Sequence, residues 1–259
     1  MDFNLKSDFK SWKDIRDGII LPQRPTLQLC ELIGIIAGDG SIASDAEETK
    51  DYRIQIYANA FDEFAYFMHT KSLVKQLFNL NMKDFLSKSD NTIYLLKRSK
   101  AVFYFLKNIG YEKIDSLIKV LSWIWETPLF VASFVRGLFD TDGCLALKNR
   151  SGKFYPVISI GLKDGGLLKL VKIWLESNRI PCVFCREQVF DERTNKIYIK
   201  FRLEVNGYRS ANEFLQLVGT CNIKNIKKMG PVRFEFVKPQ WLSHDHTISD
   251  IKSSVVCSP

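Results

Sequence analysis

Two segments far apart in the chain repeat one pattern, and this repeat constrains the fold more than any other feature. Leu32–Gly40 reads LIGIIAGDG, and Val135–Gly143 reads VRGLFDTDG. Each copy is an apolar helical segment in which a small residue follows a glycine by one turn, and each ends on Asp-Gly. Residues one turn apart share a helix face, so the small residues predict two helices packed backbone to backbone.

The acidic residue near the end of each copy, Asp39 or Asp142, falls at the carboxyl end of its helix. The helix dipole is negative there and disfavours a carboxylate by roughly 0.3–1 kcal/mol. Two such helices packed side by side bring the two carboxylates together. A like-charge pair of this kind requires a metal ion or a proton.

The segments after each motif repeat as well. Thr26 is suited to cap a helix over 27–38, and Thr127-Pro128 opens the second motif helix with proline in its first turn. Strict alternation of apolar and polar residues over 52–59 and 155–163 predicts strands. Each half therefore continues with a hairpin after its Asp-Gly.

An amphipathic helix follows in each half, with Asp62 and Asp164 as predicted caps. Strands are predicted over 91–98 and 196–205, and short helices over 99–109 and 210–218 close the halves. In the strand over 196–205, the predicted buried residues are Ile197, Ile199, Phe201, Leu203 and Val205. Ser210 and Glu213 match a capping box for the last helix.

The repeat predicts an α+β fold of two pseudo-symmetric halves, each reading helix, two strands, helix, two strands, helix. The first half covers residues 25–120 and the second covers 121–228. Residues 1–24 are interpreted as an N-terminal extension and residues 229–259 as a C-terminal tail.

Net charge is +8 with a pI near 9.1, which fits a polyanionic partner or a soluble protein that is simply basic. The sequence contains neither an apolar run of membrane-spanning length nor a signal-peptide core, so no membrane partner is expected. The six cysteines indicate free thiols in a reducing intracellular compartment, cytoplasmic or, in a eukaryote, organellar. Cys182-x-x-Cys185 lacks the second half of a zinc site, and His244 and His246 form only a weak metal motif.

Polar and cationic side chains line the predicted exposed strand faces. Such side chains suit the DNA major groove, where Arg reads guanine, Gln reads adenine and Lys meets phosphates. An ordinary solvated sheet face is the alternative interpretation. The candidate DNA-binding residues are Arg53, Gln55, Tyr57, Ser159, Arg186, Gln188, Lys196, Tyr198, Lys200 and Arg202.

The doubled motif resembles the LAGLIDADG homing endonuclease family, in its monomeric double-motif, archaeal-style form. Leu32–Gly40 is similar to the version that ends in GDG, and Phe134–Gly143, FVRGLFDTDG, is similar to the common second motif. The resemblance covers roughly Leu21 to Lys228. It implies two αββαββα halves with the motif helices at the centre and a saddle of antiparallel sheets over double-stranded DNA.

The resemblance also implies a metal-dependent double-strand DNA endonuclease that acts in homing of an intron or a similar mobile element. Asp39 and Asp142 would hold two or more Mg²⁺ ions, with the carbonyls of Gly38 and Thr141 as further ligands and Mn²⁺ or Ca²⁺ substituting for binding. Ala37 stands where the second motif has Asp140, at a position that orients the motif rather than binding metal.

A basic residue late in each half and a polar residue at the end of each second strand complete the implied catalytic set. The candidates are Lys113 and Lys224 for the first role, and Asn59 and Lys163 for the second. Two alternatives remain on the same scaffold, an RNA-binding intron maturase and a DNA-binding protein that does not cleave. Retention of both acids favours the nuclease, because neither alternative needs them.

Overall fold

In a computed structural model of the chain, the described residues are 2–3, 10–43, 46–87, 91–114, 116–119, 121–192 and 195–229. The helices are α1 (Trp12–Arg16), α2 (Leu27–Asp39), α3 (Ala46–Thr49), α4 (Phe64–Phe78), α5 (Lys100–Asn108), α6 (Ser122–Trp125), α7 (Pro128–Asp142), α8 (Gly165–Ser177), α9 (Tyr208–Leu217) and α10 (Ile223–Met229). Within these residues, each helix is too short or too polar to cross a bilayer.

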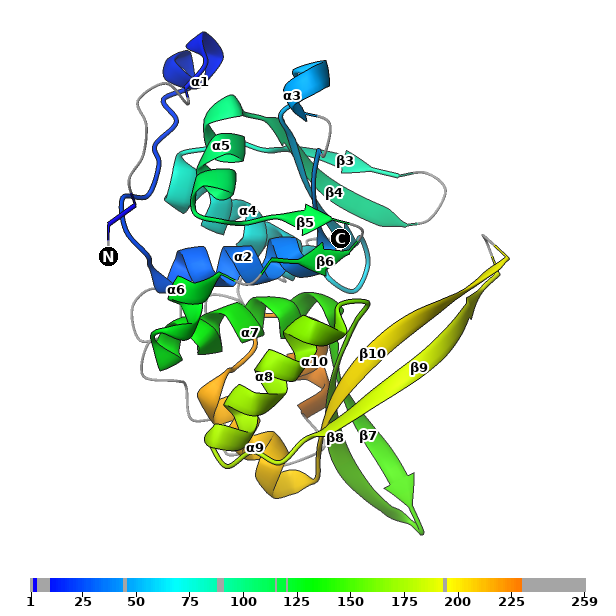
Figure 1. Cartoon of the computed structure of the whole chain (residues 1–259). Coiled ribbons are helices and arrows are strands. Elements are labelled where there is room, and N and C mark those ends of the chain that lie inside the picture. The colour runs from blue at the N-terminus through cyan, green and yellow to red at the C-terminus, as the bar shows by residue number, and fades with distance from the viewer. Residues whose placement is uncertain are drawn as a thin grey trace, which may run out of the picture.

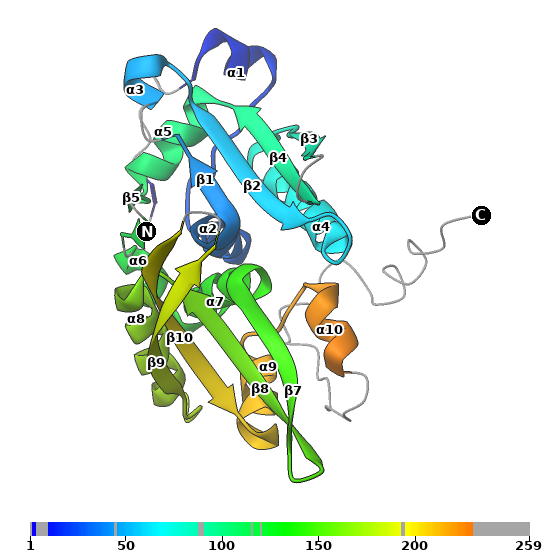
Figure 2. The same cartoon turned by 90° about the vertical axis from the view of Figure 1, so that its right-hand side faces the viewer.

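The strands form two antiparallel four-stranded sheets and one small ribbon. Their bounds are β1 (Gly40–Ile42), β2 (Arg53–Asn59), β3 (Lys83–Leu86), β4 (Thr92–Arg98), β5 (Lys113–Ile114), β6 (Leu117–Ile118), β7 (Gly143–Arg150), β8 (Lys153–Leu162), β9 (Val183–Asp191) and β10 (Lys196–Asn206). The sheet orders are β1-β2-β4-β3 and β7-β8-β10-β9, and β5 pairs with β6. Figure 2 shows both large sheets on the same side of the molecule, with the carboxyl ends of α2 and α7 between them.

The two motif helices pack against each other at the centre of the molecule (Figure 1). A Cβ added to Gly34 would lie 2.1 Å from the carbonyl oxygen of Phe134, and one added to Gly137 would lie 2.3 Å from that of Glu31. Only glycine allows this approach at both positions. The predicted backbone-to-backbone packing is therefore confirmed.

Local sequence explains where the motif helices begin. The Thr26 hydroxyl accepts a hydrogen bond from the Leu29 N–H at 3.1 Å and caps α2. Pro128 is the first residue of α7, where its fixed φ suits a helix and its missing N–H costs nothing. Both predicted starts are confirmed.

The sheet registers relate the two halves residue by residue. Gly40 pairs with Ile56 after the first motif, and Gly143 pairs with Ile160 after the second. Continuing these registers makes Tyr57 equivalent to Gly161, Asn59 to Lys163, Tyr94 to Arg202 and Thr92 to Lys200. The predicted pseudo-symmetric α+β fold is confirmed.

Two predicted helix caps are wrong. Glu63, not Asp62, occupies the N-cap position of α4, and its side chain makes no capping hydrogen bond. α9 begins at Tyr208 after Gly207, so Ser210 lies inside the helix and does not form a capping box. Asp164 does cap α8, where it accepts from the Leu167 N–H at 2.9 Å.

The predicted buried row of β10 is only half right. Leu203 and Val205 are buried, whereas Ile197 is 67 % exposed and Ile199 is 39 % exposed. The reason is visible in Figure 1, where the β9–β10 hairpin extends beyond the helices that cover the rest of its sheet. Alternation in a sequence reports which face a residue is on, not whether anything packs against that face.

The N-terminal segment packs on the first half. The Phe3 ring meets those of Phe105 and Trp123 edge-on at 5.7 and 5.5 Å. The buried Asp14 carboxylate accepts from the Ser99 hydroxyl at 2.7 Å. The predicted tail, 229–259, lies outside the described residues apart from Met229, which ends α10, and so do His244 and His246.

Candidate active site

The structure brings Asp39 and Asp142 together at the carboxyl ends of α2 and α7. Burial, and then the charges of Asp142 and Glu63, raise the pKa of Asp39 to about 7. Burial also raises the pKa of Asp142, partly offset by Lys200, Lys113 and Lys224. Each carboxylate is therefore harder to ionise than a free aspartate, and a bound cation would offset that effect.

The donor set at this position fits a hard divalent cation. Two carboxylates and the carbonyl oxygens of Gly38 and Thr141 supply only oxygen atoms, the ligands that Mg²⁺ prefers. The helices pass so closely here that a Cβ on Gly38 would lie 2.1 Å from the Thr141 hydroxyl and 2.9 Å from an oxygen of Asp142. The predicted ligands Gly38 and Asp39 of α2 therefore lie next to Thr141 and Asp142 of α7.

Lys113, the predicted basic catalytic residue of the first half, lies at the carboxyl end of α2. Its Nζ donates to the carbonyl oxygens of Ala37 at 2.8 Å, Gly38 at 3.1 Å and Gly40 at 3.1 Å. The ammonium thereby offsets the negative end of the α2 dipole. Burial lowers the pKa of Lys113, and the charges of Asp142 and Asp39 oppose that shift.

Asn222 takes the corresponding place at α7, and the sequence analysis missed it. Its Nδ2 donates to the carbonyl oxygen of Asp140 at 2.7 Å, the position equivalent to Ala37. Lys113 and Asn222 each follow by three residues a glycine with positive φ, at 94° for Gly110 and 73° for Gly219. This shared offset from a helix-ending glycine was the available sequence signal.

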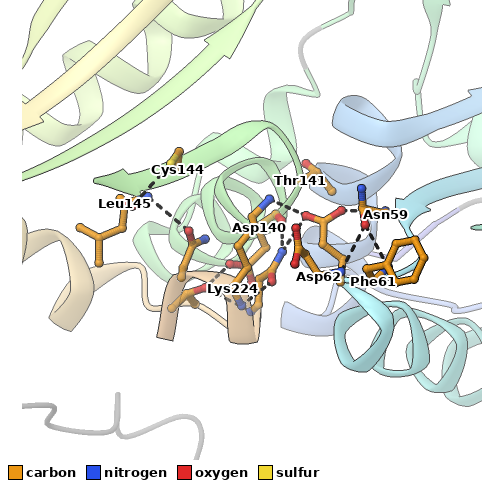
Figure 3. A network of polar contacts seen from close by, with 12 residues as sticks. Asn59, Phe61, Asp62, Asp140, Thr141, Cys144, Leu145 and Lys224 are labelled. Atoms are coloured by element: carbon orange, nitrogen blue, oxygen red, sulfur yellow. Dashed lines mark hydrogen bonds and ion pairs between the residues drawn. The ribbon is translucent and has the colours of Figure 1, made fainter. Parts of the chain in front are cut away.

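Lys224 is therefore not the positional counterpart of Lys113, although both lysines act electrostatically on the two acids, and their catalytic role stays a prediction. Lys224 Nζ instead lies 2.5 Å from Glu63 Oε1. Glu63, also missed, accepts from the Asn59 N–H at 2.9 Å and from Asn222 Nδ2 at 3.2 Å. These bonds join α4 of the first half to the loop and helix that follow α9, and Figure 3 shows Asn59 and Lys224 in this network.

Asp140 orients the second motif, as its position predicts. The fully buried carboxylate accepts from the Thr220 hydroxyl and from the Cys221 N–H, the latter at 2.7 Å. These bonds attach the end of α7 to the loop that carries Asn222. Ala37 provides no such group in the first motif.

Asn59 and Lys163 occupy equivalent strand ends but make different contacts. Asn59 Oδ1 accepts from the Phe61 N–H at 2.9 Å and the Asp62 N–H at 3.2 Å, which fixes the turn into α4 (Figure 3). Lys163 Nζ lies 4.7 Å from the centre of the Tyr198 ring. Their catalytic role stays a prediction.

Lys200, predicted only as a DNA contact, also acts electrostatically on Asp142. A Cβ on Gly161 would meet the Lys200 Cε at 2.6 Å, so the lysine crosses the sheet over a glycine. Its charge is the largest influence lowering the pKa of Asp142. The equivalent residue in the first half is Thr92, so only the second half carries this cation.

Two predicted DNA-binding residues lie on the other face of the β9–β10 hairpin. Arg186 pairs with Phe201, and Gln188 pairs with Ile199. Directly opposed residues in an antiparallel pair point to the same side. Arg186 and Gln188 therefore share the apolar row's face, opposite the face that carries Lys196, Tyr198, Lys200 and Arg202.

Acidic neighbours compensate part of that cationic face. An Arg202 guanidinium nitrogen lies 2.5 Å from Glu187, and another lies 3.3 Å from Glu204. Arg53, Gln55 and Tyr57 lie on the corresponding face of β2, and Ser159 lies on that of β8. Apart from Arg186 and Gln188, the predicted interface residues thus share one side of the two sheets.

A second polar cluster, formed by Glu31, His69 and Arg136, links the two halves. Arg136 of α7 is paired with Glu31 of α2, and His69 Nε2 lies 2.9 Å from the same carboxylate. Burial favours the neutral acid, but Arg136 and His69 together lower the pKa of Glu31 to about 2. Ligand atoms of Glu31, His69 and Cys221 lie within 4.8 Å of one another, yet the guanidinium already supplies positive charge there.

The described cysteines, Cys30, Cys144, Cys182, Cys185 and Cys221, are free thiols, as predicted. Cys257 lies outside the described residues.

Comparison with known proteins supports the resemblance stated from the motifs. Residues 129–219 match the family described as a LAGLIDADG-like domain. An uncharacterized protein of Methanocaldococcus jannaschii is 21% identical over 165 residues, which span 63% of this chain and 59% of that protein. The chain thus matches less than two thirds of that relative's length.

A solved homing endonuclease structure supports the fold. A structure of mesophilic variants of the homing endonuclease I-DmoI is 21% identical with a TM-score of 0.50, covering 74% of this chain and 95% of that one. The N-terminal LAGLIDADG domain of DUF199/WhiA is 16% identical with a TM-score of 0.48, covering 83% and 85%. The predicted fold is confirmed by the similarity to I-DmoI, and the LAGLIDADG resemblance by the family match over residues 129–219.

Proposed function

We propose that this LAGLIDADG-fold chain is a site-specific DNA endonuclease that makes a metal-dependent double-strand break in a long, asymmetric target. The observation that carries the proposal is the pair of partly buried carboxylates, Asp39 and Asp142, where the two central helices end between the sheets. Duplex DNA lying across both sheets would place its backbone at these acids (Figure 2). Homing of an intron or similar element is the proposed biological setting.

Asp39 and Asp142, with the carbonyls of Gly38 and Thr141, would hold two or more divalent ions, and the Gly38 carbonyl would have to exchange the Lys113 ammonium for an ion. Mg²⁺ is the proposed cofactor, and Mn²⁺ or Ca²⁺ would substitute for binding. When bound, such ions activate water and stabilise the leaving 3′ oxygen of a phosphodiester. The pairing of two like charges at a partly buried position is what supports this assignment.

The chain's own cations supply the rest of the site. Lys113, Lys200 and Lys224 all act electrostatically on Asp142, Lys113 and Lys224 act on Asp39 as well, and all three would face an anionic phosphodiester. Glu63 holds Lys224, and Asn222 fixes the loop at the end of α7. Lysine and arginine side chains on the sheets would bind phosphates and so position the duplex.

One chain supplies both motif helices, so we propose a monomer that stays monomeric on DNA. Light scattering at micromolar concentration tests this, and a stable dimer would contradict it. We also propose an intracellular, reducing compartment, cytoplasmic or organellar.

Digestion of a randomised duplex library with Mg²⁺, followed by sequencing of the cut ends, tests the activity. We expect one family of related cut sites with wild-type protein and none with Asp142→Asn or with EDTA. Failure of the wild type to cut any sequence would overturn the endonuclease. Binding of intron RNA without DNA cleavage would instead favour the maturase.

A further inference from the structure

The two sheets present different chemistry at equivalent positions. In the first sheet, Tyr57, Tyr94 and Phe85 stand opposite one another across β2, β4 and β3. The equivalent row of the second sheet is Gly161, Arg202 and Cys185 across β8, β10 and β9. One row is aromatic, and the other consists of a glycine, an arginine and a small thiol.

The aromatic row is a continuous exposed surface. The rings of Tyr57 and Tyr94 lie 5.7 Å apart between centres, and those of Phe85 and Tyr94 lie 5.3 Å apart and stacked. Tyr57 is 36 % exposed and Phe85 is 39 % exposed. Their strand neighbours Ile56 and Leu95 are buried on the opposite face, so the aromatic row lies on the side proposed to meet DNA.

Polar residues flank the aromatic row. Gln55 precedes Tyr57 on the same face of β2, next to Leu96 of β4 and Lys83 of β3. The major-groove edge of adenine accepts a bidentate contact from glutamine, and the methyl group of its partner thymine favours apolar contacts. Gln55 and the aromatic row therefore offer the two complementary contacts of an A·T pair, while Lys83 suits the adjacent phosphates.

We propose that the aromatic row Tyr57–Tyr94–Phe85 contacts thymine methyl groups in the major groove, so that the half-site under the first sheet is specified through A·T pairs. The inference rests on the proposed function, because it requires DNA on this face. The row is continuous with the proposed interface, and the flanking Lys83 matches phosphate charge. The second sheet has no aromatic row at the equivalent positions, Gly161, Arg202 and Cys185, so the methyl contact is confined to the first half-site.

Removing only the thymine methyl groups tests this inference. Two randomised duplex libraries are prepared that differ solely in deoxyuridine replacing thymidine, and bound sequences are selected with EDTA to prevent cleavage. Uracil pairs as thymine does and lacks only the methyl group. We expect one half-site to show A·T preferences with thymidine that weaken with deoxyuridine, by about fourfold in affinity for each methyl group in contact.

Variants assign the effect to the first sheet. Tyr94→Ser and Phe85→Ser should remove the methyl-dependent preference in one half-site and leave the other unchanged. Lys196→Gln, on the second sheet, is the matched control and should leave that preference intact. Circular dichroism tests whether each variant is folded. If Tyr94→Ser does not fold, Phe85→Ser alone provides the test.

The outcomes separate the inference from the proposed function. Failure to enrich any sequence from either library would overturn both. Enrichment of the same A·T positions with deoxyuridine as with thymidine would overturn the methyl contact alone. Loss of methyl dependence in both half-sites, or in neither, after Tyr94→Ser would also contradict the assignment to the first sheet.

Discussion

Lys113 Nζ and Asn222 Nδ2 occupy equivalent places, donating to the carbonyl oxygens of Ala37 at 2.8 Å and Asp140 at 2.7 Å at the ends of the two central helices. One group is an ammonium and the other is a neutral amide. Lys200, conversely, acts electrostatically on Asp142, with only Thr92 at its equivalent position. The two acids therefore sit in different electrostatic surroundings despite the pseudo-symmetry.

Replacing Lys113 should slow the two strand cuts unequally. Lys113→Met removes a charged donor from the α2 end, and we expect one strand to be cut on the order of 100-fold more slowly. Supercoiled plasmid carrying the target should then accumulate as nicked circles. Lys113→Arg is the charge-preserving control, and equal slowing of both strands by Lys113→Met would contradict the asymmetry.

Asp39→Asn and Asp142→Asn should each abolish double-strand cleavage while leaving metal-free DNA binding intact or stronger. Each variant retains one acid, so residual nicking is compatible with the prediction. Supercoiled-plasmid cleavage and metal-free affinity are measured for the wild type and both variants. Full cleavage by either variant, or unfolding of both, would show that these acids are structural.

The same variants should reveal a pH-dependent stability change. Folding raises the pKa of Asp39 from 3.8 to about 7, so the folded state holds its proton more tightly. Stability is therefore lost as pH rises between those values. Asp39→Asn should melt higher than the wild type at pH 8, by about 2–4 °C for each kcal/mol recovered, and no higher at pH 3.5. An equal difference at both pH values would argue against this cause.

The buried pair of Glu31 and Arg136 should show the opposite pH dependence. Folding lowers the pKa of Glu31 from 4.5 to about 2, so its contribution to stability is present above pH 4.5 and is lost as pH falls towards 2. Glu31→Gln leaves Arg136 buried without its carboxylate and should cost about 3–5 kcal/mol at pH 7. The double variant Glu31→Gln/Arg136→Met should recover much of this in urea unfolding; a double variant as unstable as Glu31→Gln would refute the explanation.

Close packing of the central helices predicts a large effect of one methyl group. Gly137→Ala places a Cβ 2.3 Å from the Glu31 carbonyl oxygen and should destabilise the chain by at least about 1–3 kcal/mol. Gly166→Ala is the matched control, because its Cβ would meet only a side-chain oxygen of Asp164 at 3.2 Å in the first turn of α8. Thermal melting compares the two, and equal melting temperatures would contradict the packing.

The faces of the β9–β10 hairpin should differ in salt dependence. Each lysine that contacts a phosphate releases counterions, so Lys196→Gln should reduce the slope of log affinity against log salt by about one. Arg186→Gln lies on the opposite face and should leave the slope unchanged. Fluorescence anisotropy over a salt series measures both, and equal slopes for the two variants would place DNA elsewhere.

The local features of the fold were predictable because short-range physics sets them. Thr26 caps α2 through a hydrogen bond to a residue three positions away, and strand alternation follows from the pleat. Gly34 and Gly137 lack side chains because the backbone of the other motif helix passes against them. The repeat of the motif predicts that each motif helix packs against the other. The repeat alone therefore predicts that Asp39 and Asp142 lie together.

Tertiary structure alone decided the contacts that join distant segments. Lys224 and Glu63 are separated by 161 residues, and Asn222 reaches Asp140 across 82. Which lysine faces a helix end, and whether Ile197 is covered, depend on how loops and helices pack, and sequence periodicity carries no information about that packing. The sequence by itself determined the halves, their central helices and the paired acids, whereas the packing between the halves decided which side chains surround those acids.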